Sequence, residues 1–419
     1  MGPEYRPRVI DSYVKKRLES SGAILIQGAK GCGKTRTASM FCKSAIQIID
    51  TRAPGTLELA RTSPHDILEG DTPRLIDEWQ AAPQIWDAVR DVIDERGITG
   101  QFILTGSSVP SDETYNHSGV GRIASVTMRP MSLFESGDSN GKVSLKDLFD
   151  GREPGLATSD NTVRDVMGMM VRGGWPFAIN NGIDDGSYAE DYVNSIIDSE
   201  VSRADGVKYD SSSVRKVMRS LARNISTIVK VSTIVSDVAG DSGSVSDKTV
   251  RRYLGALAKI FVTEDIEAWN PSVRSATAIR TSAKRQFSDP SLAIATLGLD
   301  VDGLLSDLRA TGFYFESLCD RDLRIYSQPI GGELFHYRDS SGLEADAVIH
   351  LKDGRWAPIE IKLGVDGIEA GAKNLLKLRD RVNTDSLGEP SFMMVLTSVG
   401  TAYRRDDGVW VVPIVCLGP

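Results

Sequence analysis

A glycine-rich segment near the N-terminus has the composition of a phosphate-binding loop. Residues 28–35 read GAKGCGKT and fit the spacing GxxxxGK[ST], directly after the apolar run 23–27 and before a segment with helical character. Glycines allow successive backbone N–H groups to approach phosphate oxygens, and the start of the following helix favours negative charge. We predict that Lys34 neutralises the β and γ phosphates of ATP or GTP and that the Thr35 hydroxyl binds Mg²⁺. The residues expected to bind the nucleotide are Gly28, Gly31, Cys32, Gly33, Lys34, Thr35 and Arg36.

Two acidic residues follow the apolar run 74–76. A magnesium ion at a phosphate loop takes a further carboxylate from the end of a neighbouring strand, and Asp77 stands at such an end. We predict that Asp77 binds the metal through water and that Glu78 orients or activates the water that attacks the γ-phosphate. Acidic pairs are also common at helix starts, so this assignment depends on the loop upstream.

Two further positions are candidates for contact with the γ-phosphate. The apolar run 101–104 is followed by hydroxyl residues, and Ser107 or Thr105 is expected to sense the phosphate, although a plain turn after a strand gives the same pattern. Arg122 is a candidate arginine finger or phosphate contact. The alternative is a surface arginine without such a role.

A second group of charged residues lies near the C-terminus. Asp346 opens one predicted strand (345–350), and Glu360 and Lys362 close the next (357–362) after a hairpin turn. Strand alternation puts Glu360 and Lys362 on one face, beside Asp346. Two carboxylates that bind Mg²⁺ and a lysine that positions water form the core of PD-(D/E)xK nucleases. Glu316, on a preceding predicted helix, is expected to complete the metal shell. Strands also carry Glu and Lys pairs with no catalytic role.

Basic residues supply candidate DNA contacts. Lys248, Arg251 and Arg252 are spaced i, i+3 and i+4, so they share one face of a predicted helix that would enter a major groove. The stretch 231–269 fits helix, turn, helix and a short strand pair, which is the outline of a winged helix. The acid-free run 268–288 adds Arg274, Arg280, Lys284 and Arg285. The alternative is that these basic side chains are merely solvated.

The elements that must position these residues fall into three groups. A chain of 419 residues is longer than one hydrophobic core usually organises. Short apolar runs alternate with amphipathic segments in the first part, which predicts a parallel sheet with helices on both faces. We predict an AAA-like P-loop α/β domain at 1–135, a helical and winged-helix domain at 163–269, and an α/β domain like restriction endonucleases at 289–419. The Gly-, Ser- and Asp-rich segment 135–161 predicts an unpacked surface connection.

The composition limits the class of protein. The hydrophobic share of 41% and the charged share of 25% are typical of soluble globular proteins. A net charge of -8 argues against a surface that is basic throughout, as a general nucleic-acid coat would need. No apolar run approaches the roughly 20 residues of a membrane span, and the N-terminus lacks the apolar core of a signal peptide. We therefore expect a cytoplasmic protein with no membrane contact. Four cysteines and four histidines show no paired metal-ligand spacing, so disulfides and structural zinc are not expected.

Over nearly its full length, the sequence resembles prokaryotic ATPases of the AAA superfamily that end in a domain of unknown function. The motifs that carry the resemblance are 28–35, 76–78 with Gln80, 104–108, 121–122, 129–135, 173–176, 289–292, 337–339, and Glu344, Asp346, Glu360 and Lys362. The resemblance implies an ATPase core, a winged helix and a C-terminal domain similar to restriction endonucleases, without implying cleavage. The chain departs from the family at 198–200, where Asp-Ser-Glu stands in place of the more frequent Arg-Asp, and the role of that position is left open.

These patterns lead to one hypothesis with two rivals. We interpret the chain as an ATP-binding protein, an ATPase dependent on Mg²⁺, that controls a winged-helix and nuclease-like module with DNA as its candidate target. The first rival is a DNA endonuclease that requires Mg²⁺ and is regulated by ATP. The second is a non-enzymatic switch, in which ATP binding reshapes a surface for a protein partner. The oligomeric state and the choice between ATP and GTP are left open.

Overall fold

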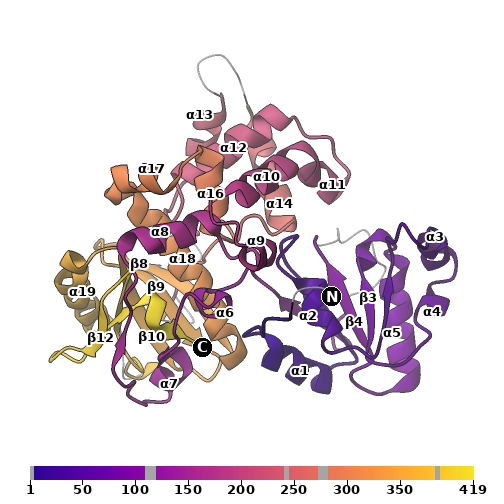
Figure 1. Cartoon of the computed structure of the whole chain (residues 1–419), viewed down its shortest axis with the longest axis horizontal. Coiled ribbons are helices and arrows are strands. Elements are labelled where there is room, and N and C mark those ends of the chain that lie inside the picture. The colour runs from indigo at the N-terminus through magenta and orange to yellow at the C-terminus, as the bar shows by residue number, and fades with distance from the viewer. Residues whose placement is uncertain (1–3, 109–118, 240–244, 272–281, 383–386) are drawn as a thin grey trace. The chain divides into compact units, whose positions relative to one another are not determined.

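The structure is a computed structural model that describes residues 4–108, 119–239, 245–271, 282–382 and 387–419 (Figure 1). The chain divides into two compact units, which are described one at a time. Unit 1 comprises Met1–Pro130, Ser199–Lys208 and Ala256–Phe261, and unit 2 comprises Met131–Asp198, Tyr209–Gly255 and Val262–Pro419. No helix in the described part of the chain is long and apolar enough to cross a membrane.

Unit 1 is built on a five-stranded parallel sheet with the strand order β2-β3-β4-β1-β5. Its strands are β1 (Ala23–Gln27), β2 (Ser44–Gln47), β3 (Arg74–Asp77), β4 (Phe102–Gly106) and β5 (Ile123–Thr127). Its helices are α1 (Asp11–Ser20), α2 (Lys34–Ser39), α3 (Gly55–Thr62), α4 (Pro64–Ile67), α5 (Gln84–Arg96) and α11 (Val201–Asp205), with a 3-10 turn η1 (Trp79–Ala81).

Helices cover both faces of this sheet because side chains alternate along each strand. In β1, Leu25 packs into the core that contains α5, while Ile24 packs into the core that contains α1 and α2. In β4, Phe102 and Ile103 divide between the same two cores. The predicted parallel sheet with helices on both faces is confirmed.

Unit 2 contains a seven-stranded mixed sheet with the order β7-β12-β13-β11-β10-β9-β8, and a separate strand pair β14-β6. The strands are β6 (Val143–Ser144), β7 (Ala157–Thr158), β8 (Gly332–Arg338), β9 (Glu344–Leu351), β10 (Trp356–Lys362), β11 (Met394–Thr397), β12 (Thr401–Arg404), β13 (Trp410–Pro413) and β14 (Leu417–Gly418). The helices α18 (Leu308–Ser327) and α19 (Ile368–Arg381) pack against this sheet. The hairpin predicted around residue 353 joins β9 to β10, with Ala347 opposite Ile359.

The segment 135–161 is packed, so its prediction as an unpacked surface connection was wrong. Strand β6 pairs with β14 and β7 with β12, which ties the segment to the C-terminal part of unit 2. Val143, Leu145 and Leu148 are buried. The Gly, Ser and Asp content led to this wrong prediction. These residues occupy turns and caps, while a few apolar side chains between them supply the buried contacts. The short helices here are α6 (Leu133–Ser136) and α7 (Leu145–Phe149).

The middle of the chain is helical. The helices are α8 (Val163–Arg172), α9 (Pro176–Asn181), α10 (Ser187–Ser195), α12 (Ser211–Arg223), α13 (Val231–Ala239), α16 (Pro290–Leu297) and α17 (Val301–Ser306). A π-helical turn η2 (Ile196–Glu200) and α14 (Asp247–Lys259) each run from one unit into the other. After α14, two isolated antiparallel bridges pair Thr263 with Phe287 and Ile266 with Lys284. A winged helix stays a prediction, since helix order and two bridges do not define one.

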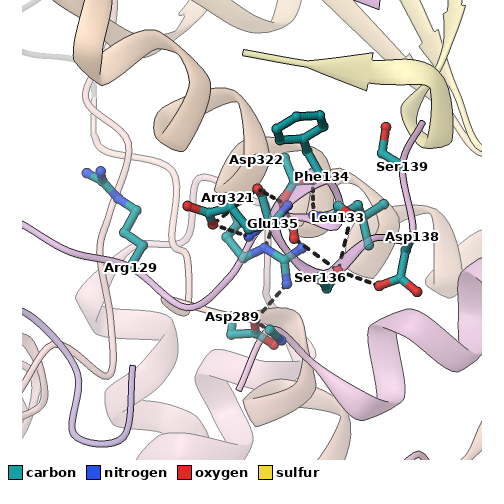
Figure 2. Close-up of polar contacts among 12 residues, drawn as sticks. Arg129, Leu133, Phe134, Glu135, Ser136, Asp138, Ser139, Asp289, Arg321 and Asp322 are labelled. Atoms are coloured by element: carbon teal, nitrogen blue, oxygen red, sulfur yellow. Dashed lines mark hydrogen bonds and ion pairs between the residues drawn. The ribbon is translucent and has the colours of Figure 1, made fainter. Parts of the chain in front are cut away.

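Arg321, in α18, is the centre of a buried ion cluster in unit 2 (Figure 2). Its Nη1 lies 2.8 Å from Asp289 Oδ2, and its Nη2 lies 2.7 Å from Asp322 Oδ1. Asp322 also accepts a hydrogen bond of 2.9 Å from the backbone N–H of Leu133, and Asp289 accepts one of 2.9 Å from Gly174. The cluster therefore holds together segments that lie far apart in the sequence and that carry three of the motifs noted above.

Candidate functional site

The glycines of the predicted phosphate loop are required by its backbone. Gly28, Gly31 and Gly33 have φ values of 154°, 78° and 104°, which side chains with a Cβ rarely adopt. A Cβ on Gly28 would lie 2.0 Å from the carbonyl oxygen of Met128. The loop follows β1, and the buried ammonium of Lys34 donates hydrogen bonds of 2.9 Å to the carbonyl oxygens of Gly28 and Ala29. The loop thus holds a lysine amine against its own backbone.

Thr35 and Asp77 are brought together as predicted. The Thr35 hydroxyl donates a hydrogen bond of 2.8 Å to Asp77 Oδ1, and the Thr105 hydroxyl donates a short one to the same oxygen. Asp77 and Thr105 are register partners on β3 and β4, and β4 pairs with β1, so these side chains meet at the carboxyl edge of the sheet. Hydroxyl and carboxylate oxygens are the ligands that Mg²⁺ prefers, so the pair Thr35 and Asp77 fits this ion.

A cavity of about 380 Å³ lies beside these residues, within unit 1. Glu78 and Ser107 both line it, and Glu78 has left-handed backbone angles of φ 58° and ψ 42°. The side-chain amide of Gln80 donates a short hydrogen bond to Glu78 Oε2, which orients this carboxylate. Of the two predicted phosphate sensors, Ser107 lines the cavity, whereas Thr105 is engaged with Asp77.

Cys32 and Arg36 differ in exposure. The Cys32 side chain is fully buried, and its thiol points to the carbonyl oxygen of Met128 at 3.5 Å. Arg36 is exposed on α2. The Cys32 side chain therefore packs inside the loop, and only its backbone is available to a nucleotide.

Arg122 lies at the wrong edge of the sheet to contact a phosphate in its own chain. It precedes β5, and its carbonyl oxygen accepts a hydrogen bond from the N–H of Ala23, at the start of β1. The phosphate loop follows the opposite end of β1. Four residues of strand separate the two ends, which is a distance of about 13 Å. The Arg122 guanidinium forms an exposed ion pair of 2.9 Å with Asp94. The prediction of Arg122 as a phosphate contact within one chain was therefore wrong, because the sequence does not show which way β5 runs.

In unit 2, Asp346, Glu360 and Lys362 converge. The Lys362 ammonium lies 3.0 Å from Asp346 Oδ2 and 2.6 Å from Glu360 Oε2. Asn374 donates a hydrogen bond of 2.6 Å to the other Glu360 oxygen. Burial and, after it, the neighbouring Asp346 charge raise the pKa of Glu360 to about 7, against the opposing effects of Lys362 and Asn374. These residues form what we call the carboxylate–lysine centre: Asp346, Glu360 and Lys362.

Glu316 pairs with a buried lysine. Its carboxylate lies 2.5 Å from the ammonium of Lys284, which is buried and also donates a short hydrogen bond to the carbonyl oxygen of Asp346. Asp320 lies 3.9 Å from the same ammonium. Within the described ranges, no three acidic, His or Cys residues are arranged to hold a metal ion. Lys284 therefore pairs with one Glu316 oxygen in this structure, and the metal role of Glu316 stays a prediction.

Comparison with known proteins gives a match for the N-terminal part. Residues 20–136 match an AAA domain family. This match supports a P-loop ATPase-like α/β fold for this part of the chain. Residues 163–303 and 311–417 match two domains of unknown function, DUF8612 and DUF4143.

Whole-chain relatives are distant. Uncharacterized proteins of Mycobacterium tuberculosis (Rv2008c) and Mycobacterium bovis (Mb2031c) are each 23% identical over 355 residues, which covers 83% of this chain and 72% of the relative. The Walker-type ATPase PABY2304 of Pyrococcus abyssi shares 13% identity with a TM-score of 0.43, over 70% of this chain and 96% of that chain. A TM-score this low supports no argument about this protein.

The cavity in unit 1 is lined by two residues that sequence reasoning missed. Glu200 Oε1 lies 2.9 Å from the ammonium of Lys30, in the phosphate loop, and 3.4 Å from Nη1 of Arg203. Glu200 and Arg203 both line the cavity. The departure from the family at 198–200 marked this position, but its partner Lys30 is 170 residues away in the sequence, so no local signal could assign its role.

The candidate DNA contacts have different outcomes. Lys248, Arg251 and Arg252 are exposed on α14; Arg251 pairs with Asp247, and the Arg252 guanidinium stacks over the Tyr209 ring at 5.7 Å. Their DNA contact stays a prediction. In the basic run 268–288, Lys284 is buried and Arg285 forms an ion pair with Asp265, so both are engaged within unit 2. The prediction of DNA contact was wrong for Lys284, because its ammonium is not exposed. Arg274 and Arg280 lie outside the described residues.

Proposed function

We propose that this protein is an ATPase that requires Mg²⁺ and that its nucleotide state controls the helical and C-terminal parts of the chain. The observation that supports it best is the hydrogen bond of 2.8 Å between Thr35 and Asp77, beside a phosphate loop with three glycines at positive φ. This pairing joins the residue that ends the loop to the acidic residue that ends a nearby strand. P-loop ATPases hold their magnesium ion with these two residue types.

Each residue of the site has a distinct role in the proposed reaction. Lys34 supplies positive charge to the β and γ phosphates, and Mg²⁺, when bound by Thr35 and Asp77, neutralises charge that develops on the phosphate oxygens. Glu78 accepts a hydrogen bond from the attacking water and orients it, while Gln80 holds the Glu78 carboxylate in place. Ser107 is the proposed sensor of the γ-phosphate, since it lines the same cavity.

The proposed control of the rest of the chain rests on Glu200. This residue contacts the phosphate loop through Lys30, and it ends η2, a π-helical turn whose first residues belong to unit 2. Such turns occur frequently at functional sites. A triphosphate beside Lys30 would compete with Glu200 for the lysine amine, so nucleotide binding would change the interactions of a segment that is covalently continuous with unit 2.

The test is phosphate release by the purified full chain with Mg²⁺ and ATP, with and without plasmid DNA. We expect turnover in the wild type. Glu78→Gln should bind ATP with unchanged affinity and hydrolyse it about 10²- to 10⁴-fold more slowly, the range typical for loss of a general base. Full turnover in Glu78→Gln would remove this residue from the mechanism. Tight ATP binding without turnover in the wild type would favour the non-enzymatic switch.

We propose as a second candidate function that the carboxylate–lysine centre hydrolyses phosphodiester bonds in DNA. It is favoured by the shared contacts of Lys362 with Asp346 and Glu360 at 3.0 and 2.6 Å. In this mechanism the two carboxylates would bind a divalent cation, and Lys362 would position the attacking water. Plasmid nicking with Mg²⁺ that disappears in Glu360→Ala and persists in Glu344→Ala, an exposed residue of β9, would support it. An intact plasmid in all three proteins would exclude it.

A further inference from the structure

A cavity of about 490 Å³ lies in unit 2 between α19 and the turn that joins β8 to β9. The turn contributes Ser341, and α19 contributes Asn374, Lys377, Asp380 and Arg381. A cavity of this size can hold a nucleotide-sized group. We call it the α19 cavity.

Asn374 connects the α19 cavity to the carboxylate–lysine centre. It lines the cavity, and its side-chain amide donates hydrogen bonds of 2.6 Å to Glu360 Oε1 and to the carbonyl oxygen of Glu344. The Asn374 side chain therefore lies between the cavity and the Glu360 carboxylate of the carboxylate–lysine centre. Helix α19 can lie this close because Gly371 has no side chain; a Cβ there would lie 3.3 Å from the Cβ of Glu360.

The helical wall of the cavity carries an excess of positive charge. Lys373, Lys377 and Arg381 are spaced by four residues and exposed, so they form one stripe along α19. Arg381 donates a hydrogen bond of 3.0 Å to the Ser341 hydroxyl and also pairs with Asp339 at 3.3 Å, so its charge is partly offset. Among the described residues, Lys377 has no ion-pair partner, whereas the acidic Asp380 is paired with Arg379 at 2.8 Å.

We propose that the α19 cavity binds the phosphodiester backbone of a nucleic acid and presents it to the carboxylate–lysine centre. Lysine and arginine cations, a serine hydroxyl and an asparagine amide are the groups that proteins use to contact phosphate and sugar. A cationic stripe that extends past the cavity along α19 fits a polyanion better than a single phosphate. The proposal rests on the second candidate function, because the carboxylate–lysine centre would cleave the backbone that the cavity binds.

The test measures binding of a fluorescently labelled 15-nucleotide DNA strand, single or duplex, to the full chain in EDTA, so that no metal-dependent cleavage occurs. Lys377→Gln should weaken binding about 3- to 10-fold and lower the slope of log affinity against log salt by roughly 1, as expected for one lost phosphate contact. The double variant Lys373→Gln, Lys377→Gln should lower the slope by roughly 2. The matched control is Lys352→Gln, which removes the same charge from an exposed hairpin turn outside the cavity.

Equal losses in Lys377→Gln and Lys352→Gln, an unchanged salt slope, or no binding by the wild type would each overturn the proposal. So would competition by polyglutamate as strong as that by unlabelled DNA, since the cavity would then favour an acidic protein. A nicking assay with Mg²⁺ distinguishes the cavity proposal from the second candidate function. Binding that depends on Lys377 without nicking supports the cavity and excludes the second function, whereas nicking that is unaffected by Lys377→Gln overturns the cavity alone.

Discussion

Replacement of Lys284 by methionine should destabilise unit 2 strongly. Its side chain is 6% exposed, and its ammonium is paired with Glu316 at 2.5 Å. It also lies 3.9 Å from Asp320, whose side chain is 2% exposed. Methionine keeps most of the volume and removes the charge, so the variant isolates the electrostatic contribution.

The magnitude follows from the burial of the partners. Removing one member of a buried ion pair leaves an uncompensated charge and costs about 3–5 kcal/mol. Replacing both members by apolar residues is often close to neutral, so Lys284→Met with Glu316→Leu should recover most of the loss. Burial raises the pKa of Glu316 and the Lys284 ammonium opposes this rise. Without the lysine this carboxyl pKa rises further, and a raised carboxyl pKa means that stability is lost as pH rises. The deficit of the variant should therefore be larger at pH 8 than at pH 5.

The assay is hydrogen exchange of the α18 amides as a function of urea, because two compact units need not unfold in one step. The control is Lys352→Met, an exposed position where a change within about 0.5 kcal/mol is expected. A loss below about 1 kcal/mol in Lys284→Met, or a double variant whose loss equals the sum of the two single losses, would refute the reasoning.

Three further predictions concern other sites. Lys34→Ala should abolish ATP binding measured by calorimetry, and unchanged affinity would contradict the site assignment. Arg203→Ala should lower ATP turnover, because Arg203 lines the proposed nucleotide cavity, while the neighbouring exposed Lys208→Ala should leave turnover unchanged. His336→Gln should flatten the pH dependence of unit 2 stability between pH 6.5 and 4. Burial lowers the pKa of His336 to about 4, so the unfolded chain binds a proton that the folded chain does not, and stability is lost as pH falls through this window. Urea titrations at pH 7.5 and 5 would show this, and equal slopes in both proteins would contradict it.

The sequence by itself determined the phosphate loop, the parallel sheet around it and the meeting of Thr35 with Asp77. These features depend on short-range rules: glycine spacing sets the loop, apolar runs set the strands, and parallel strands place their carboxyl ends at one edge of the sheet. The approach of Asp346 to Glu360 and Lys362 was predictable for the same reason, since a hairpin joins neighbouring strands with side chains in strict alternation.

The tertiary structure decided the contacts between residues far apart in the chain. Lys30 meets Glu200 over 170 residues, and the N–H of Leu133 meets Asp322 over 189. It also decided that Lys284, in the basic run predicted to contact DNA, is a buried partner of Glu316, and that Arg122 lies at the sheet edge opposite the phosphate loop. A sequence pattern reports local periodicity and residue type. The packing of whole helices and strands determines which distant charge pairs with a buried carboxylate. An unpaired charge is destabilising only when it is buried, and burial exists only in the folded chain.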